Sequence, residues 1–249
     1  MTNLIEAYIT IHDQDLLIQC EEQEQFQALS HTYIFVGPRP VDRIPSDVKV
    51  VVSRDYTPNY EHFPQFYDFT GWFTLAHHNL LTSEYAIMVQ YDHYIGVPNA
   101  AVRCLEALQG EAGVVAFVPG HYDNWYLQVE GFKEILRTCS LACGVNLPEL
   151  EAARPFNQWP STQGTAWNVD YFKAFMEWVR PIFDLAQSHV LAGHAAERML
   201  NIYTKTTTES AYLPGLFRHD SKDCHGTSDF MRGEFDSFQS KNRAFMCLS

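Results

Sequence analysis

The first half of the chain alternates short apolar runs with segments of helical periodicity. The apolar runs are rich in Val, Ile, Phe and Tyr and predict strands over residues 5–11, 32–36, 48–53, 85–90 and 113–118. Between them, helical patterns run from Asp13, an expected N-cap, to about Leu29, and over residues 70–81 and 99–108. Several runs are continuously apolar, which is typical of parallel strands covered by helices on both faces. We therefore predict an α/β fold whose ligands bind outside the carboxyl ends of the strands.

The second half of the chain is less regular. Helical patterns are expected over residues 131–143, 169–187 and 192–205, the second interrupted by Pro181. Residues 145–160 have the composition of a loop, residues 213–219 are a candidate last strand, and the polar tail from Asp220 is expected at the surface. We predict one domain over residues 1–249, with a Rossmann-like half at 1–118 and a less regular half at 119–249.

Composition narrows the partners of this domain. The chain has 249 residues, of which 46% are hydrophobic, enough to bury one substantial core. With 17 Lys and Arg against 30 Asp and Glu, the net charge of −13 argues against non-specific nucleic-acid binding. An anionic ligand would need a local device, such as a metal ion, a helix N-terminus or a few placed Arg residues. Because the sequence carries no signal peptide and no apolar run of about 20 residues, we expect a cytoplasmic protein with reduced cysteines.

Several common catalytic motifs are missing from the sequence. It contains no GxxxxGK[ST] loop, no GxGxxG after the first strand, no GxSxG elbow and no HExxH. P-loop NTPases, Rossmann dehydrogenases, the usual α/β-hydrolases and zincins are therefore disfavoured.

The strongest candidate for chemistry is a buried strand that ends in charged residues. Residues 85–94 read YAIMVQYDHY, so Asp92 and His93 follow the apolar run. A carboxylate at this position can hold Mg²⁺ or Mn²⁺, which in turn holds a diphosphate. The alternative interpretation is that Asp92 caps the next turn and His93 is a partly buried surface residue. A late histidine can return to the same metal, and His219, which ends an apolar run, is preferred over His225.

Two acidic residues in the second half are candidates for a general base. Glu197 belongs to the segment GHAAER at residues 193–198, near the start of a predicted helix. It can equally be a surface residue stabilised by the helix dipole. Asp170, in GTAWNVDYF at residues 164–172, is the second candidate, in a stretch that suits either sugar recognition or core packing. In the first half, YDFTGWF at residues 67–73 offers an Asp and rings that can bind a base or sugar, although such rings normally belong to the core.

Together these segments resemble a GT-A type glycosyltransferase. More narrowly, they resemble the capsular-polysaccharide-type family of small transferases, and the layout is similar to that of small glycosyltransferases of large algal viruses. Residues 84–94 match a strand that opens with Glu-Tyr and ends in spaced tyrosines. Residues 166–172 loosely match a strand that runs into an aromatic helix, and residues 193–200 match a following segment. The sequence departs from the usual D-x-D motif, because residues 90–92 keep only the last acid.

The resemblance implies a metal-dependent hexosyl- or pentosyltransferase with a nucleoside-diphosphate donor, UDP by preference, and a glycan acceptor. It implies Mn²⁺ or Mg²⁺ held by Asp92 and His219, with Glu197 or Asp170 as the base. Residues 1–118 would bind the donor and residues 119–249 the acceptor, in the host cytoplasm if the protein is viral. The expected donor-binding residues are Thr10, His12, Arg54, Tyr56, Asp68, Trp72, Gln90 and Tyr91.

Two other classes remain open. A nucleotidyltransferase or nucleotide-sugar hydrolase would share the α/β sheet and the metal, but would need no acceptor site. A non-catalytic carbohydrate-binding module would show no metal-dependent donor binding.

Overall fold

The protein is built around one twisted, mostly parallel sheet of seven strands. The structure, a computed structural model, describes residues 4–62, 66, 68–117, 119–121, 125–127, 129–154, 158–162, 164–185, 191–207 and 210–219. The sheet has the strand order β10-β6-β9-β4-β1-β2-β3. Its strands are β1 (Ile5–Ile11), β2 (His31–Phe35), β3 (Val50–Val52), β4 (Tyr85–Gln90), β6 (Val114–Ala116), β9 (Thr165–Asn168) and β10 (Ser210–Tyr212). All neighbouring strands are parallel except β9, which runs antiparallel to both β4 and β6. The predicted α/β class with a mostly parallel sheet is confirmed.

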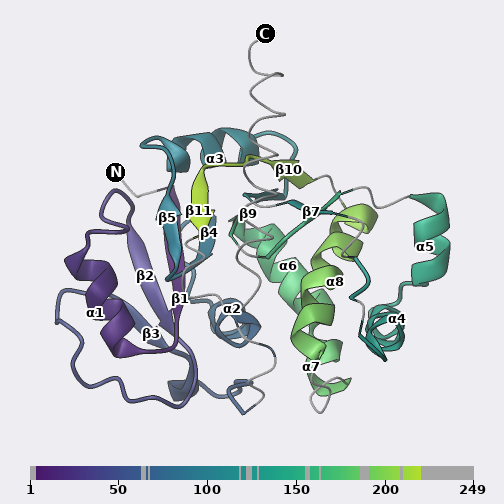
Figure 1. Cartoon of the computed structure of the whole chain (residues 1–249), viewed down its shortest axis with the longest axis horizontal. Coiled ribbons are helices and arrows are strands. Elements are labelled where there is room, and N and C mark those ends of the chain that lie inside the picture. The colour runs from purple at the N-terminus through teal and green to yellow at the C-terminus, as the bar shows by residue number, and fades with distance from the viewer. Residues whose placement is uncertain are drawn as a thin grey trace, which may run out of the picture.

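Helices cover both faces of the sheet, as the continuous apolar strands predict (Figure 1). On one face, α1 (Gln14–Glu22) and α3 (Ala100–Leu108) pack on strand residues such as Ile9 and Val89. On the other face, Tyr8 and Met88 belong to a larger core. That core includes residues of α2 (Asp68–His77), α4 (Phe132–Ala142), α5 (Leu147–Ala153), α6 (Val169–Val179), α7 (Pro181–Leu185) and α8 (Ala192–Thr207).

A small antiparallel pair brings the late part of the chain to the end of β4. Strand β5 (His93–Ile95) pairs with β11 (Phe217–His219), and His219 lies opposite His93. The approach depends on Gly96, because a Cβ there would lie 2.1 Å from the Gly215 carbonyl oxygen. Only a residue without a side chain allows the two backbones to come so close. A second pair joins β7 (Pro119–His121) to β8 (Gln158–Pro160).

Three local expectations from the sequence are corrected. The helix expected to reach Leu29 ends at Glu22, because Glu24 adopts a left-handed φ of 54° and the chain turns to bury Phe26. Residues 145–160 are not all loop, since they contain α5 and β8. The strand expected over residues 213–219 is only β11, and β10 forms just before it. The break at Pro181 is confirmed, because α6 ends at Val179 and α7 begins at Pro181.

The remaining expectations concern the cysteines, membrane spans, the division at residue 118 and the C-terminal tail. The four described cysteines (Cys20, Cys104, Cys139 and Cys143) are free thiols. In the described part of the chain, every helix is too short or too polar to cross a membrane. The division at residue 118 stays a prediction, and the tail from Asp220 lies outside the described residues.

Candidate active site

Two neighbouring parallel strands end together at the carboxyl edge of the sheet. Thr10 of β1 is the register partner of Gln90 of β4, and Asp92 follows two residues later. Asp92 is 8% exposed, and its Oδ1 lies 3.2 Å from Nδ1 of His93. The backbone N–H of Gln90 donates to the same nitrogen at 3.3 Å. The turn after β4 therefore fixes a nearly buried carboxylate at the edge where parallel sheets bind their ligands.

Asp68 joins this edge from a different element. It is the first residue of α2, and its Oδ2 accepts a hydrogen bond from Nε2 of Gln90 at 2.5 Å. Burial, followed by the negative charges of Asp92 and Glu197, raises the pKa of Asp68 to about 7 against the lowering effect of that hydrogen bond. Asp92 and Glu197, from distant parts of the sequence, thus each lie close enough to Asp68 to act on its charge.

Glu197 comes from the second half of the chain, as predicted for a base candidate. It lies in the second turn of α8, and its side chain is 21% exposed. Its Oε2 accepts from Nη1 of Arg198 at 2.8 Å and lies 3.4 Å from Nδ1 of His194. Its other oxygen, Oε1, makes no hydrogen bond within the part of the chain that the structure describes. One oxygen is therefore held and the other is available to a ligand.

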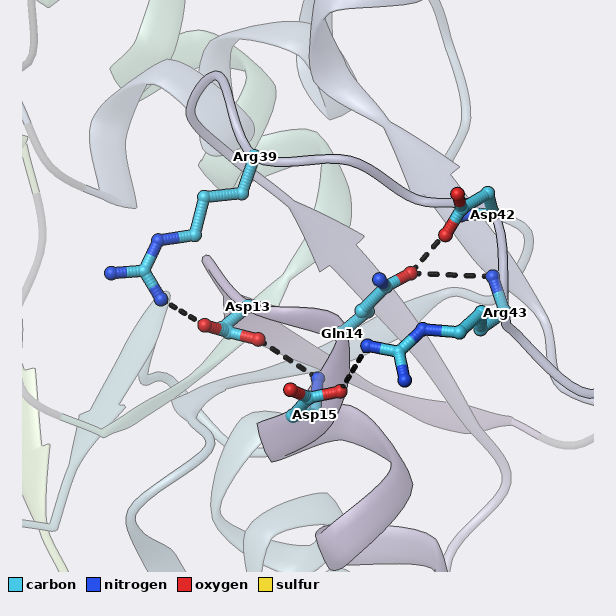
Figure 2. Close-up of polar contacts among 6 residues, drawn as sticks. All are labelled: Asp13, Gln14, Asp15, Arg39, Asp42 and Arg43. Atoms are coloured by element: carbon cyan, nitrogen blue, oxygen red, sulfur yellow. Dashed lines mark hydrogen bonds and ion pairs between the residues drawn. The ribbon is translucent and has the colours of Figure 1, made fainter.

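Arg54, the predicted cation, is bound to a loop whose own arginine, Arg39, acts on His12. Nη1 of Arg54 donates to the carbonyl oxygens of Gly37 at 2.8 Å and Arg39 at 2.7 Å, so Arg54 holds the loop after β2. Arg39 extends from that loop and is 58% exposed where it pairs with Asp13 (Figure 2). Burial lowers the pKa of His12, and the charge of Arg39 lowers it further, while Asp92 opposes both. His12 therefore lies within electrostatic range of both Arg39 and the Asp92 carboxylate. Sequence reasoning missed Arg39, whose only signal is its position just after Gly37-Pro38.

The loop that carries Arg39 is fastened to the start of α1. Oε1 of Gln14 accepts from the backbone nitrogens of Asp42 at 3.0 Å and Arg43 at 3.2 Å (Figure 2). Nη2 of Arg43 pairs with Oδ1 of Asp15 at 2.6 Å. These contacts fix the loop at residues 42 and 43, and the Arg39 side chain stays at the surface.

Of the other donor-binding candidates, Thr10, His12 and Tyr91 lie near the ends of β1 and β4, and Tyr56 lies elsewhere. Thr10 is 4% exposed, and its Oγ1 has no hydrogen-bond partner among the described residues. The rings of His12 and Tyr91 meet edge to face at 5.2 Å. Tyr56 packs against His78, just beyond the end of α2 that lies away from Asp68.

Trp72 is a correction. It is 2% exposed and packs edge to face against Trp167 and Phe172 at 6.0 and 5.7 Å. A ring enclosed between α2, β9 and α6 cannot stack on a base or sugar, so Trp72 belongs to the core.

Asp170 does not join the carboxylates. Strand β9 runs antiparallel to β4, and its last residue, Asn168, pairs with Tyr85, the first residue of β4. Asp170 follows in the first turn of α6 and is exposed, at the opposite edge of the sheet from Asp92. The structure therefore brings Glu197, and not Asp170, to the candidate site.

The late histidines are placed only in part. The backbone of His219 lies opposite that of His93, next to Asp92, while its side chain lies outside the described residues. His225 lies outside them altogether.

A divalent cation fits the chemistry of this edge. Among the described residues, no three His, Cys, Asp or Glu side chains are arranged to enclose a metal. The gathered negative charge of Asp68, Asp92 and Glu197 nevertheless favours a cation, and carboxylate oxygens suit Mg²⁺ and Mn²⁺. A site completed by ligand oxygens needs few protein ligands, so Asp92 can serve as the protein's carboxylate ligand.

Comparisons with known proteins show the fold. No family model and no curated protein sequence matches the chain. It is similar to the bifunctional glycosyltransferase WbbM in its apo structure, with a TM-score of 0.60, 14% identity, and coverage of 88% of this chain and 46% of WbbM. It therefore has the fold of GT-A glycosyltransferases and spans less than half the length of WbbM.

Two further solved structures are more distant. The galactosyltransferase LgtC, solved with donor and acceptor sugar analogues, has a TM-score of 0.48 and 10% identity, covering 93% of this chain and 95% of LgtC. The glucosyl-3-phosphoglycerate synthase of Mycobacterium tuberculosis, solved with Mn²⁺ and UDP, has a TM-score of 0.44 and 11% identity, covering 92% and 76%.

Proposed function

We propose that the protein is a metal-dependent glycosyltransferase. It would move a sugar from a nucleoside-diphosphate donor, UDP by preference, to a hydroxyl group of a glycan. The observation that carries the proposal is that Asp68, bonded to Gln90 at the end of β4 in this fold, lies within electrostatic range of both Asp92 and Glu197. Two of these acids come from the first half of the chain, and Glu197 comes from the second. That arrangement suits a reaction with a donor on one side and an acceptor on the other.

The donor would bind where β1 and β4 end. Asp92 would hold Mn²⁺ or Mg²⁺, with His219 as the candidate second ligand. The bound ion supplies Lewis acidity that neutralises charge on the leaving diphosphate. Arg39 can add a charge-assisted hydrogen bond to a phosphate oxygen by leaving Asp13. The hydroxyl of Thr10, which has no partner among the described residues, can hydrogen-bond the donor at the same edge.

The acceptor would bind on the side of α8. In a reaction that inverts the anomeric centre, the acceptor oxygen attacks the anomeric carbon as the bond to the diphosphate oxygen breaks. The acceptor proton moves to Oε1 of Glu197, the oxygen without a partner among the described residues. The contacts of Oε2 with Arg198 and His194 hold the carboxylate in place during this transfer.

A product assay tests the proposal. The protein is incubated with Mn²⁺, a panel of nucleotide sugars and a panel of glycans, and both free nucleotide and glycan mass are measured. We expect nucleoside diphosphate to be released as one glycan gains the mass of one sugar. Nucleoside diphosphate release without any glycan gain would indicate a hydrolase. Pyrophosphate release in a parallel assay, with a nucleoside triphosphate and a sugar phosphate in place of the nucleotide sugar, would indicate a nucleotidyltransferase. Glycan binding with no donor binding would indicate a carbohydrate-binding module.

A further inference from the structure

Arg198 is a buried cation within a largely apolar environment. It is 4% exposed, and its Cζ lies 4.3 Å from the ring centroid of Trp159 and 5.5 Å from that of Phe132. Its Nε donates to the carbonyl oxygen of Trp125 at 3.3 Å. These contacts come from α4, β8 and the segment at residues 125–127, so three separate parts of the chain fix the guanidinium.

The acid that Arg198 contacts is its own neighbour in sequence. Side chains at positions i and i+1 of a helix point in different directions, so their contact is not an ordinary result of helix geometry. Nη1 of Arg198 nevertheless lies 2.8 Å from Oε2 of Glu197. Burial lowers the pKa of Arg198, while Glu197 opposes that change, so the pair compensates for part of the cost of burying the cation.

A fixed cation beside a partly exposed acid restricts that acid. Glu197 is 21% exposed and has three side-chain torsions, whereas the Arg198 guanidinium is enclosed by rings. The contact holds Oε2 and leaves Oε1 without a hydrogen bond to the described residues. His194 adds a longer contact of 3.4 Å from a side chain that is 43% exposed, so Arg198 is the stronger constraint.

We propose that Arg198 is the positioning residue for the base: its guanidinium, fixed by Trp159, Phe132 and the Trp125 carbonyl, orients Glu197 so that Oε1 meets the acceptor hydroxyl. This rests on the proposed function, because it assigns Glu197 the role of base. In this role Arg198 acts through Glu197 rather than on the donor or acceptor. It transmits the rigidity of the core to a side chain that would otherwise sample several rotamers.

Kinetic variants test the positioning role. Arg198→Met keeps a long side chain and removes the charge, and Arg154→Met is the matched control. Arg154 also contacts α8, through the carbonyl oxygen of Lys205 in the last turn of that helix. We expect Arg198→Met to lower kcat by about 10²-fold, because a misplaced catalytic group costs that much. Donor Kd should stay within about twofold, and Arg154→Met should leave both values near those of the wild type.

A double-mutant cycle separates positioning from general support of the fold. In a Glu197→Gln background, Arg198→Met should reduce kcat by less than about twofold, since no base remains to be oriented. Arg198→Lys keeps the charge without the planar fork and should restore part of the lost rate. Fully additive losses in the cycle would overturn the proposal. If Arg198→Met fails to fold, the same cycle is run with Arg198→Lys, and an additive loss there overturns it equally.

A structural readout does not depend on activity. Crystal structures of the wild type and Arg198→Met, or Arg198→Lys if only that variant folds, should differ in the position of the Glu197 carboxylate. An unchanged carboxylate would contradict positioning by Arg198, whatever the kinetics. If the wild type turns over no nucleotide sugar, the proposed function fails, while the carboxylate position still decides whether Arg198 holds Glu197. The two failures are therefore distinguishable.

Discussion

Glu6 and Asp68 lie at opposite ends of the strands of the same sheet, and their pKa values are shifted in opposite directions. Glu6 lies near the amino end of β1 and is 4% exposed. Its carboxylate accepts hydrogen bonds from Tyr8 at 3.1 Å, from Thr32 at 2.9 Å and from Thr82, and it lies 3.5 Å from Nζ of Lys49. Burial alone would raise the pKa of Glu6, but these donors together lower it below its usual value.

Asp68, at the carboxyl edge, has the opposite balance. The hydrogen bond from Gln90 is outweighed by burial and by the charges of Asp92 and Glu197, so its pKa rises to about 7. The protein's own donors therefore stabilise the charge of Glu6, while negative charge around Asp68 is left without such compensation. The Glu6 network thus supports the fold, and the surplus negative charge beside Asp68 supports the proposal that a cation and its ligand bind there.

The largest expected effect concerns Glu197, the proposed general base. Glu197→Gln should lower kcat of transfer by about 10²–10⁴-fold, the usual contribution of a general base, with donor affinity kept. Asp170→Asn is the matched control, because Asp170 lies at the other edge of the sheet and should leave kcat unchanged. Steady-state assays with the donor and acceptor found active would give both values. Equal losses of kcat in the two variants would contradict the assignment of Glu197, rather than Asp170, as the base.

The next effect concerns stability at the amino edge. Glu6→Gln removes the charge that several donors serve, and should lower the free energy of unfolding by about 2 kcal/mol, the scale of a hydrogen bond to a charged group. Asp68→Asn at pH 8 should leave that free energy unchanged or raise it, because the ionised acid is unfavourable there. Urea unfolding of the two variants measures both. A larger loss from Asp68→Asn than from Glu6→Gln would reverse the comparison.

A smaller effect is expected for the exposed arginines of the loop after β2. Arg39→Ala should weaken nucleoside-diphosphate binding about tenfold, the lower range for a charge-assisted hydrogen bond. Arg43→Ala removes a similar arginine, 61% exposed and paired with Asp15, and should change Kd by less than about twofold. Calorimetric titration in the presence of Mn²⁺ compares them. A matching loss in Arg43→Ala would mean that the loop acts only through its net charge.

The smallest expected effect is on the free energy of unfolding of the metal-free protein, which should change gradually with pH. Between the ordinary value of 3.8 and about 7, folded Asp68 keeps a proton that the unfolded chain has lost, so stability falls as pH rises. The slope from this group is at most about 1.4 kcal/mol per pH unit. Glu6 acts in the opposite sense: its contribution is present above 4.5 and is lost as pH falls through its lowered pKa.

Unfolding experiments in EDTA between pH 3 and pH 8 measure these slopes. Asp68→Asn should remove the decline between about pH 4 and 7, and Glu6→Gln should reduce the loss at lower pH. A profile of Asp68→Asn that runs parallel to the wild type would show that Asp68 titrates normally in the folded protein.

The fold could be predicted well where local pattern decides structure. Strand β4 spans residues 85–90 as expected, since an apolar run between polar segments fixes both ends. The break at Pro181 follows from the missing N–H of proline. The end of α1 could not be predicted, because it depends on burying Phe26 against other elements.

The site could be predicted only in part, because residue type does not fix direction. Asp92 and Glu197 were identifiable as acids at element ends, but the sequence holds no signal that Glu197 would come near Asp68. Trp72 had the right chemistry for stacking and was wrong because its ring faces α6. Arg54 was expected to bind the donor, but it donates to carbonyl oxygens of the loop after β2. The path of that loop depends on tertiary packing, which the sequence pattern does not show.

The most direct test of the central claim is metal-dependent binding at Asp92. Calorimetric titration of UDP and a panel of other nucleoside diphosphates is carried out on the wild type and on Asp92→Asn, each with Mn²⁺ and with EDTA. We predict that Mn²⁺ tightens binding of at least one nucleotide by the wild type and that Asp92→Asn, folded to the same melting temperature within a few degrees, abolishes this tightening. Equal Mn²⁺-dependent affinity in the two proteins, or no nucleotide binding by the wild type, would contradict the account.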